Sequence, residues 1–385
     1  MPQLKIINKK MKKFLPLLVV SVSITVLAHA NILRVGYFGT HINNVDYAAF
    51  GPAYTAAAAG DTVLVFPGIT AIGQTLNKKL IIIGPGDWLD SSSNPAGNAG
   101  MQASTGVATV SYFNFYAGSE GSVVMGLEGG SYDVRVNDIT IRRNRNISVY
   151  LALGGNTYTN LQVLENYQVT IAAGNTTNSS ITNLNVSNNF IYSFGTGPGN
   201  IYGGSISNNV WAFDNTQAPA SDGGSTTMSY NGGNIELGGG AYLVQNNIFE
   251  SLNSITANAN GNYFSFGNTA NSVFNYNLAL QTATPQNWGA GVGNVITPIA
   301  NASKIFVAFP ALGTSSGDGR YQLAAGSPAL TVGAGNTAIG MFAGSSPYKL
   351  SLIPPIPSIY KLGSPQGNNP AGSTITIDVS TRGNN

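Results

Sequence analysis

The chain has 385 residues, no Cys and a formal net charge of +2, and charged residues make up only 8% of it, against about 25% in typical soluble domains. Gly (48) and Asn (44) are each more numerous than all 32 charged residues together. This composition excludes a coiled coil, an intrinsically disordered chain, a disulfide scaffold and any Cys-ligated metal site. It predicts a long, mainly β chain with a large core, and the weak charge argues against a nucleic-acid partner.

The first thirty residues have the pattern of a signal peptide. A lysine-rich stretch at 9–13 precedes an apolar run at 14–27, and Ala28-His29-Ala30 follows as a cleavage site. The start could be Met1 or Met11, and an uncleaved N-terminal anchor is the alternative interpretation. Cleavage removes five lysines and no carboxylate, which leaves 12 basic and 15 acidic residues and a net charge of −3. We therefore expect a secreted or outer-surface bacterial protein, without a membrane span in the mature chain.

An asparagine repeat runs through the body of the sequence. Each clear copy places an Asn pair between a short β run and two apolar residues. The pairs are 188–189, 208–209 and 246–247, and single members of the same column are Asn144, Asn166, Asn231, Asn262 and Asn277. A spacing of about 15 to 23 residues is typical of one supersecondary unit per repeat.

The repeat predicts a solenoid of stacked coils whose strands pair with those of neighbouring coils. Coils need bends, and Asn and Gly adopt the left-handed backbone of a bend at the lowest cost. Asn residues at the same bend in successive coils can also bond to one another as an amide ladder.

The N-terminal part carries a second pattern. A short Ala-rich helix at 56–59 leads into "GDTVLVFPG" at 60–68 and then "KKLIIIGPG" at 78–86. This order resembles the first coils of right-handed parallel β-helix proteins of the pectin-lyase-like superfamily, in which the helix caps the end of the stack. The resemblance implies an all-β fold with an N-cap and parallel β-helix over residues 31–345. Strings at 325–329 and 339–342 resemble the last coil of secreted β-helix proteins of Bacteroidetes type.

The last forty residues form a different kind of segment, the tail at 346–385. Pro354, Pro355 and Pro357 force extended geometry, and an alternating pattern predicts a strand at 373–380. Two interpretations stay open: the tail folds back along the rod, or this strand pairs with the sheet edge of a partner protein.

The charged residues that could carry chemistry gather mainly between 133 and 165. Alternation points Ile139 and Ile141 inward and puts a bend at Arg143. Because Glu165 lies 22 residues later, about one coil, we expect it to form an ion pair with Arg143 across adjacent coils. The cluster is a structural salt bridge, a basic groove for an anionic glycan or the site of a catalytic base, and the first interpretation is favoured. Its members are Asp133, Arg135, Asp138, Arg142, Arg143, Arg145 and Glu165.

Further candidates lie on later coils. The carboxylates Asp214, Asp222, Glu236 and Glu250 could bind Ca²⁺ if the protein were a lyase; otherwise they are solvated loop charges, and we expect no metal and no cofactor. The aromatic residues Tyr192, Trp211 and Tyr230 are the candidates for stacking on sugar rings.

The resemblance implies polysaccharide or cell-surface glycan as the partner, but the fold does not determine the activity. Hydrolases of this fold use paired Asp residues and often His, whereas this sequence has no Asp-Asp pair and no His in its coils. We therefore expect a glycan-binding protein or an adhesive or structural rod without catalysis. The alternative is a polysaccharide lyase or, less favoured, a glycoside hydrolase.

Overall fold

A computed structural model describes residues 30–36, 46–89, 106–151, 156–173, 180–195, 201–212, 234–236, 241–250, 265–267, 272–280, 291–298, 301–308, 315–363 and 377–383. The chain divides into two units, residues 1–31 and 32–385. The predicted signal peptide lies outside the described residues, except for Ala30. Within the described part of the chain, no helix is long and apolar enough to cross a membrane.

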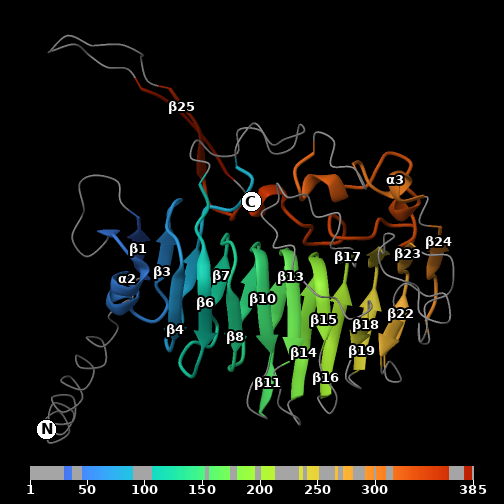
Figure 1. The fold of residues 1–385 in the computed structure, drawn as a ribbon, viewed down its shortest axis with the longest axis horizontal. Helices are drawn as coiled ribbons and strands as arrows, with labels where there is room; N and C mark the ends of the chain where they lie inside the picture. Colours follow the sequence, from blue (N-terminus) through green and yellow to red (C-terminus); the bar gives the residue numbers. More distant parts are fainter. Residues whose placement is uncertain are drawn as a thin grey trace, which may run out of the picture. The chain divides into compact units, whose positions relative to one another are not determined.

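Two twelve-stranded sheets form the body of the second unit, and every strand pair within them is parallel (Figure 1). Sheet A consists, in spatial order, of β2 (Asp46–Tyr47), β1 (Ile32–Val35), β3 (Thr62–Val65), β5 (Ile81–Ile83), β7 (Val123–Met125), β9 (Thr140–Arg142), β12 (Gln162–Leu164), β14 (Ser180–Ser187), β16 (Ile201–Ser207), β19 (Ala241–Gln245) and β22 (Val273–Asn275), with β11 (Thr157–Thr159) beside β14.

In sheet B the spatial order starts from the last strand in the sequence and ends at the first. It consists of β24 (Val295–Thr297), β23 (Leu278–Leu280), β20 (Ile248–Glu250), β17 (Val210–Ala212), β15 (Phe190–Gly195), β13 (Tyr167–Ala173), β10 (Arg145–Leu151), β8 (Ser131–Val134), β6 (Val110–Phe115) and β4 (Ile72–Leu76), with β18 (Asn234–Glu236) beside β15 and β21 (Ser265–Gly267) beside β18. The chain passes from a strand of sheet A to a strand of sheet B and back, so the architecture is an all-β stack of coils, compatible with a parallel β-helix.

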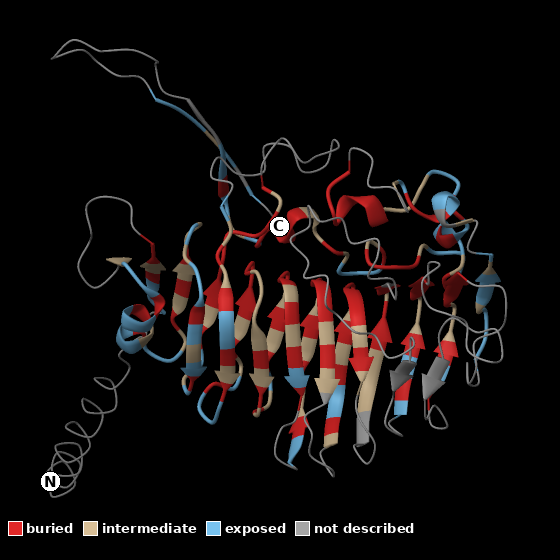
Figure 2. Cartoon of the chain, viewed as in Figure 1, coloured by how far each residue is buried: buried red, intermediate tan, exposed pale blue. Residues whose placement is uncertain are grey.

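The core lies between the two sheets and is built from columns of apolar side chains. One column joins the middle residues of the sheet A strands, which are in register and buried: Leu33, Val63, Ile82, Val124, Ile141, Val163, Val186, Ile206, Val244 and Phe274. Figure 2 shows the buried positions recurring along the strands of both sheets. Alternation of buried and less buried residues, as in β3 and β8, allows a strand to bury one face without slipping in register.

An asparagine ladder connects the coils where sheet A turns into sheet B. The Oδ1 of each rung after the first accepts hydrogen bonds of 2.9–3.2 Å from the backbone N–H and the Nδ2 of the rung before it, and the Oδ1 of the first accepts from the backbone N–H of Leu127 at 3.1 Å. The rungs are Asn144, Asn166, Asn189, Asn209, Asn247, Asn277 and Asn294. The predicted ladder is thus present at the described members, and Asn209 bonds directly to Asn247 and Asn247 directly to Asn277. The predicted members Asn231 and Asn262 lie outside the described residues. Asn294, which the sequence repeat did not include, is an additional rung.

The residue before each rung adopts a left-handed backbone. Its φ lies between 53° and 71° at Arg143, Glu165, Asn188, Asn208, Asn246, Tyr276 and Gly293, and Gly126, at the corresponding bend one coil before Arg143, has a φ of 73°. Asn and Gly tolerate this conformation, whereas it costs other residues roughly 1–2 kcal/mol each. Arg143, Glu165 and Tyr276 are therefore at strained positions.

A short helix precedes the first long coils. Helix α2 spans Phe50–Ala56 and buries Phe50 and Ala53, so it lies earlier than the predicted 56–59. It ends at Ala56, where Ala57 turns to extended backbone, and Lys78 Nζ donates to the carbonyls of Tyr54 (2.8 Å) and Ala57 (2.7 Å). These bonds satisfy carbonyls that the end of a helix leaves free.

The chain leaves the sheets after β24 and returns along the bends. We call residues 315–356 the return segment. As the return segment proceeds, it contacts bends that lie progressively earlier in the sequence. Its hydrogen bonds join Gly340 to Asn246, Met341 and Ala343 to Asn188, Ser346 to Glu165, and Ile353 to Arg143. The return segment therefore runs back along the stack, as one of the two interpretations of the tail proposed, but it begins well before residue 346.

The end of the described chain forms a separate ribbon. Strands β25 (Ser358–Gly363) and β26 (Asp378–Arg382) pair in antiparallel fashion with each other. Of the strand predicted at 373–380, residues 373–376 lie outside the described residues; the described strand begins at Asp378, and its partner in the structure is a strand of the same chain.

Short helical turns complete the described chain: α3 (Ala302–Ile305), η3 (Gly319–Tyr321), η4 (Pro328–Leu330) and η5 (Leu350–Leu352).

Candidate functional site

The charged cluster predicted from the sequence divides into separate groups. Arg142 Nη2 contacts Glu165 Oε1 at 2.6 Å, and Arg143 Nε contacts Glu165 Oε2 at 2.5 Å. The expected ion pair between adjacent bends is therefore present, with Arg142 as a second cation on the same carboxylate. Elsewhere Asp133 pairs with Arg135 at 2.8 Å, and Asp138 accepts a hydrogen bond from Asn160 at a different bend.

The return segment covers the Arg–Glu–Arg group. Ser346 Oγ donates to Glu165 Oε1 at 2.8 Å, and Arg143 Nη1 donates to the carbonyl of Ile353 at 2.9 Å. The side chain of Glu165 is only 1% exposed, against 25% for that of Arg142. Burial lowers the pKa of Arg143 and Glu165 opposes this effect. The group thus fastens the return segment to the coils, and its carboxylate is closed to a large ligand.

Arg145 belongs to a further buried group that sequence reasoning missed. Its Nη1 contacts both carboxylate oxygens of Asp87 at 2.9 Å and Glu128 Oε1 at 3.5 Å. Its guanidinium also lies 4.7 Å from the centre of the Trp88 ring. A parallel β-bridge between the backbones of Glu128 and Arg145 places the two residues on adjacent coils. Their spacing of 17 residues in the sequence could have indicated this. Asp87 is 58 residues from Arg145, and no repeat connects the two.

Burial affects the protonation of both carboxylates in this group. It raises the pKa of Asp87, although Arg145 and the backbone N–H of Trp88 act in the opposite direction. Burial also raises the pKa of Glu128; the negative charge of Asp87 adds to this effect and Arg145 opposes it.

The later candidates do not form one site in the described residues. Asp214, Asp222 and Tyr230 lie outside them. Glu236 lies on β18 across from Gly195 of β15, and Glu250 lies on β20 across from Ala212 of β17 and is buried. Over the ranges that the structure describes, no three His, Asp or Glu side chains gather where they could hold a metal ion.

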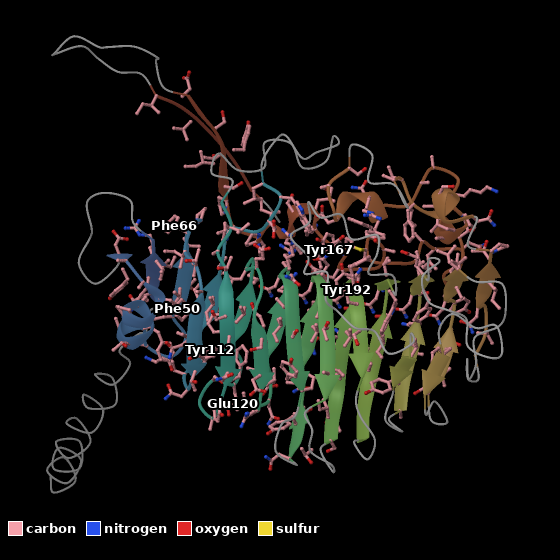
Figure 3. All side chains as sticks on the ribbon, viewed as in Figure 1. Phe50, Phe66, Tyr112, Glu120, Tyr167 and Tyr192 are labelled. Carbon is pink, nitrogen blue, oxygen red and sulfur yellow. The ribbon has the colours of Figure 1, made fainter. Side chains whose placement is uncertain are left out.

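Tyr192 and Trp211 are buried, contrary to the surface position that stacking on a sugar requires. Tyr192 lies beneath the return segment, where Gln168 Nε2 donates to its hydroxyl at 2.6 Å; Figure 3 shows it beside Tyr167 near the ends of their strands. Trp211 points into the coils and packs between Phe194 and Phe249. Neither ring offers a free face in this structure.

Exposed tyrosines lie instead on the outer face of sheet B. Tyr112 on β6, Tyr116 directly after it and Tyr150 on β10 are between 38% and 40% exposed. Phe113 and Phe115, between the first two, are fully buried. Simple alternation within "YFNFY" and "ISVYL" could have identified these outward tyrosines.

The strand register connects these tyrosines through polar side chains. Tyr112 is in register with Ser131 and, through it, with Ser148, while Asn114 is in register with Asp133 and, through it, with Tyr150. One strand separates β6 from β10, so the two tyrosine-bearing strands are about 10 Å apart. We call the surface of Tyr112, Asn114, Tyr116, Ser131, Asp133, Arg135, Ser148 and Tyr150 the tyrosine face.

Two contacts hold the tyrosine rings in place. A methyl group on Gly73 would lie 2.7 Å from Tyr112 Cε1, so the Tyr112 ring lies against the backbone of that glycine. The guanidinium of Arg135 lies 5.0 Å from the centre of the Tyr116 ring and is held there by Asp133. These contacts restrain the rings of Tyr112 and Tyr116 in the structure without a ligand.

Sequence comparisons with known proteins do not assign a function to this site. No known family model matches the sequence, and no curated protein sequence matches it.

Proposed function

We propose that this protein is a secreted or cell-surface β-helix that binds polysaccharide on the tyrosine face and is not a catalyst. The observation that carries this proposal is the group of three outward tyrosines on or directly after β6 and β10, two strands of one sheet that both pair with β8, with Asn, Ser and Asp side chains between them. The negative face of an aromatic ring attracts the weakly positive C–H groups of a sugar ring, and the polar side chains between the tyrosines suit its hydroxyl groups.

The stack of coils also determines how a glycan would lie. A chain that crosses the strands passes from β6 to β10 over about 10 Å, roughly the length of two sugar rings. Tyr112 or Tyr116 would then stack on one sugar and Tyr150 on a later one in the same chain. We also propose that the coil is right-handed, that α2 caps it and that the protein is related to pectin-lyase-like proteins. The parallel sheets and the asparagine ladder support these three points.

The test is a binding assay on plant, algal and bacterial polysaccharides, with and without Ca²⁺. We expect at least one polysaccharide to bind, and Tyr150→Ala to weaken it by about tenfold, which corresponds to ~1.4 kcal/mol. Tyr360→Ala is the matched control, because Tyr360 is 39% exposed but lies on β25. Equal losses in both variants would contradict a site on the tyrosine face.

The enzyme alternative has one supporting observation, the raised pKa of Glu128 beside Arg145. A carboxyl group whose pKa is raised by burial is a candidate general acid. The same polysaccharide panel distinguishes the two functions. Release of shortened or ultraviolet-absorbing unsaturated products would establish a glycosidase or a lyase in place of a binding protein.

A further inference from the structure

Strands β25 and β26 form a ribbon that pairs with no other strand among the described residues. Their register runs from Ser358 opposite Arg382 to Gly363 opposite Asp378. A two-stranded ribbon is only marginally stable in water, whereas a third or fourth strand stabilises it. The second edge of β26 is thus a candidate surface for another strand.

The side chains of β26 make this edge unusual for a protein surface. Alternation places Ile377, Val379 and Thr381 on one face, and Ile359 of β25 shares it because Ile359 is in register with Thr381. Ile377 is 57% exposed, Val379 52% and Ile359 47%. Natural edges are usually protected by charges or prolines rather than by such apolar residues.

The sequence of β26 is complementary to itself when two copies run antiparallel. Asp378-Val379-Ser380-Thr381-Arg382 has opposite charges at its two ends. With Ser380 opposite Ser380 of a second copy, Asp378 of each copy is opposite Arg382 of the other. Opposite charges across a strand pair stabilise it, and like charges destabilise it.

We propose that β26 is a homotypic docking strand, which pairs edge to edge with β26 of a second copy of this chain about a twofold axis at Ser380. The pairing would produce a four-stranded antiparallel sheet with a continuous apolar face formed by both copies. The charge pattern favours this occupant, because a self-complementary patch is what a twofold symmetric contact requires. The proposal is independent of the glycan-binding function.

Single-cysteine variants test the register directly, because the chain has no Cys of its own. Ser380→Cys would place two thiols directly opposite each other, within about 5 Å and so within reach of a disulfide. Ile377→Cys is the matched control, since its two copies would be about 20 Å apart. Under mild oxidation we expect covalent dimer from Ser380→Cys and almost none from Ile377→Cys. Equal yields in the two variants would overturn the proposal.

Charge reversal supplies a second measurement, by sedimentation of the purified protein over a range of concentrations. We expect a doubled mass for the unaltered protein. Asp378→Arg or Arg382→Asp alone brings like charges together and should raise the dissociation constant at least about tenfold. The double reversal should restore the dimer. A monomer at all concentrations, or a dimer unaffected by either single reversal, would refute the proposal, and circular dichroism would verify that each variant is folded.

Discussion

Asn166 and Asn189 are bonded to each other twice: Asn189 Oδ1 accepts from the backbone N–H of Asn166 at 2.9 Å and from its Nδ2 at 3.0 Å. Asn189 Nδ2 in turn donates to the carbonyls of Val163 (2.8 Å) and Ser187 (3.0 Å). One fully buried side chain thus bonds to three backbone groups in two adjacent coils. Buried polar groups that are completely satisfied in this way rigidify a core.

Asn189→Ala should therefore destabilise the protein far more than an ordinary surface change. It leaves the N–H of Asn166 without its partner and removes one bond each from the carbonyls of Val163 and Ser187, the second of which still accepts from the backbone N–H of Glu165; we expect a cost of roughly 1–3 kcal/mol. The control is Asn185→Ala, on the partly exposed face of β14, where the Asn donates one bond of 2.8 Å to Gln162; we expect under about 1 kcal/mol there. Urea midpoints measure both, and similar shifts would contradict a structural role for the ladder.

Glu165→Gln should be strongly destabilising, because it removes the negative charge between Arg142 and Arg143. Arg143 is buried, and an unpaired buried charge costs about 3–5 kcal/mol. Asp133→Asn breaks the more exposed pair with Arg135 and should cost under about 1 kcal/mol. If Glu165→Gln were as mild as Asp133→Asn in thermal unfolding, the group would not be fastening the return segment.

Local patterns were sufficient to predict the coils, the ladder and the Arg143–Glu165 pair. Alternation identifies Ile139 and Ile141 as core, and the 22-residue spacing of Arg143 and Glu165 equals one coil. Both signals lie within two neighbouring coils. A solenoid is easy to predict at this level, because each repeat contacts mainly its neighbours.

The failures come from contacts that no repeat encodes. The outward face of β15 should be exposed in a simple coil, yet Phe190 and Tyr192 are covered by the return segment. Phe190 packs 4.3 Å from the ring of Tyr321, more than a hundred residues later. The burial of Tyr192 and the pairing of Arg145 with Asp87 both depend on the positions of chain segments that are distant in the sequence. Alternation and repeat spacing cannot indicate those positions.

The Asp87–Glu128–Arg145 group predicts a pH dependence of stability. The pKa of Glu128 is raised in the folded state, so folding favours its protonated form. Its contribution to stability is complete below the ordinary pKa of 4.5 and is lost as the pH rises through the raised value. Glu128→Gln, which carries no charge at any pH, should therefore gain in urea midpoint relative to the unaltered protein between about pH 4 and 7. Glu120→Gln, at an exposed carboxylate, controls for charge alone, and a pH-independent difference would contradict the prediction.

Asn188 should hold the return segment in place without being needed by the coils. Its Nδ2 donates to the carbonyls of Met341 (2.9 Å) and Ala343 (2.6 Å), and its φ of 58° is one that Gly adopts freely. Asn188→Gly therefore keeps the bend but removes both bonds.

We expect hydrogen exchange at residues 339–348 to accelerate by about tenfold or more in Asn188→Gly, since each lost bond contributes about 1 kcal/mol, while exchange in β13 and β15 stays unchanged. Asn208→Gly is the matched control. Asn208 occupies the equivalent bend with a φ of 55°, and its Oδ1 has no hydrogen-bond partner in the described structure. If the two variants accelerated exchange equally, the loss of the Asn188 bonds could not be the cause, because the return segment would then be responding to the added glycine.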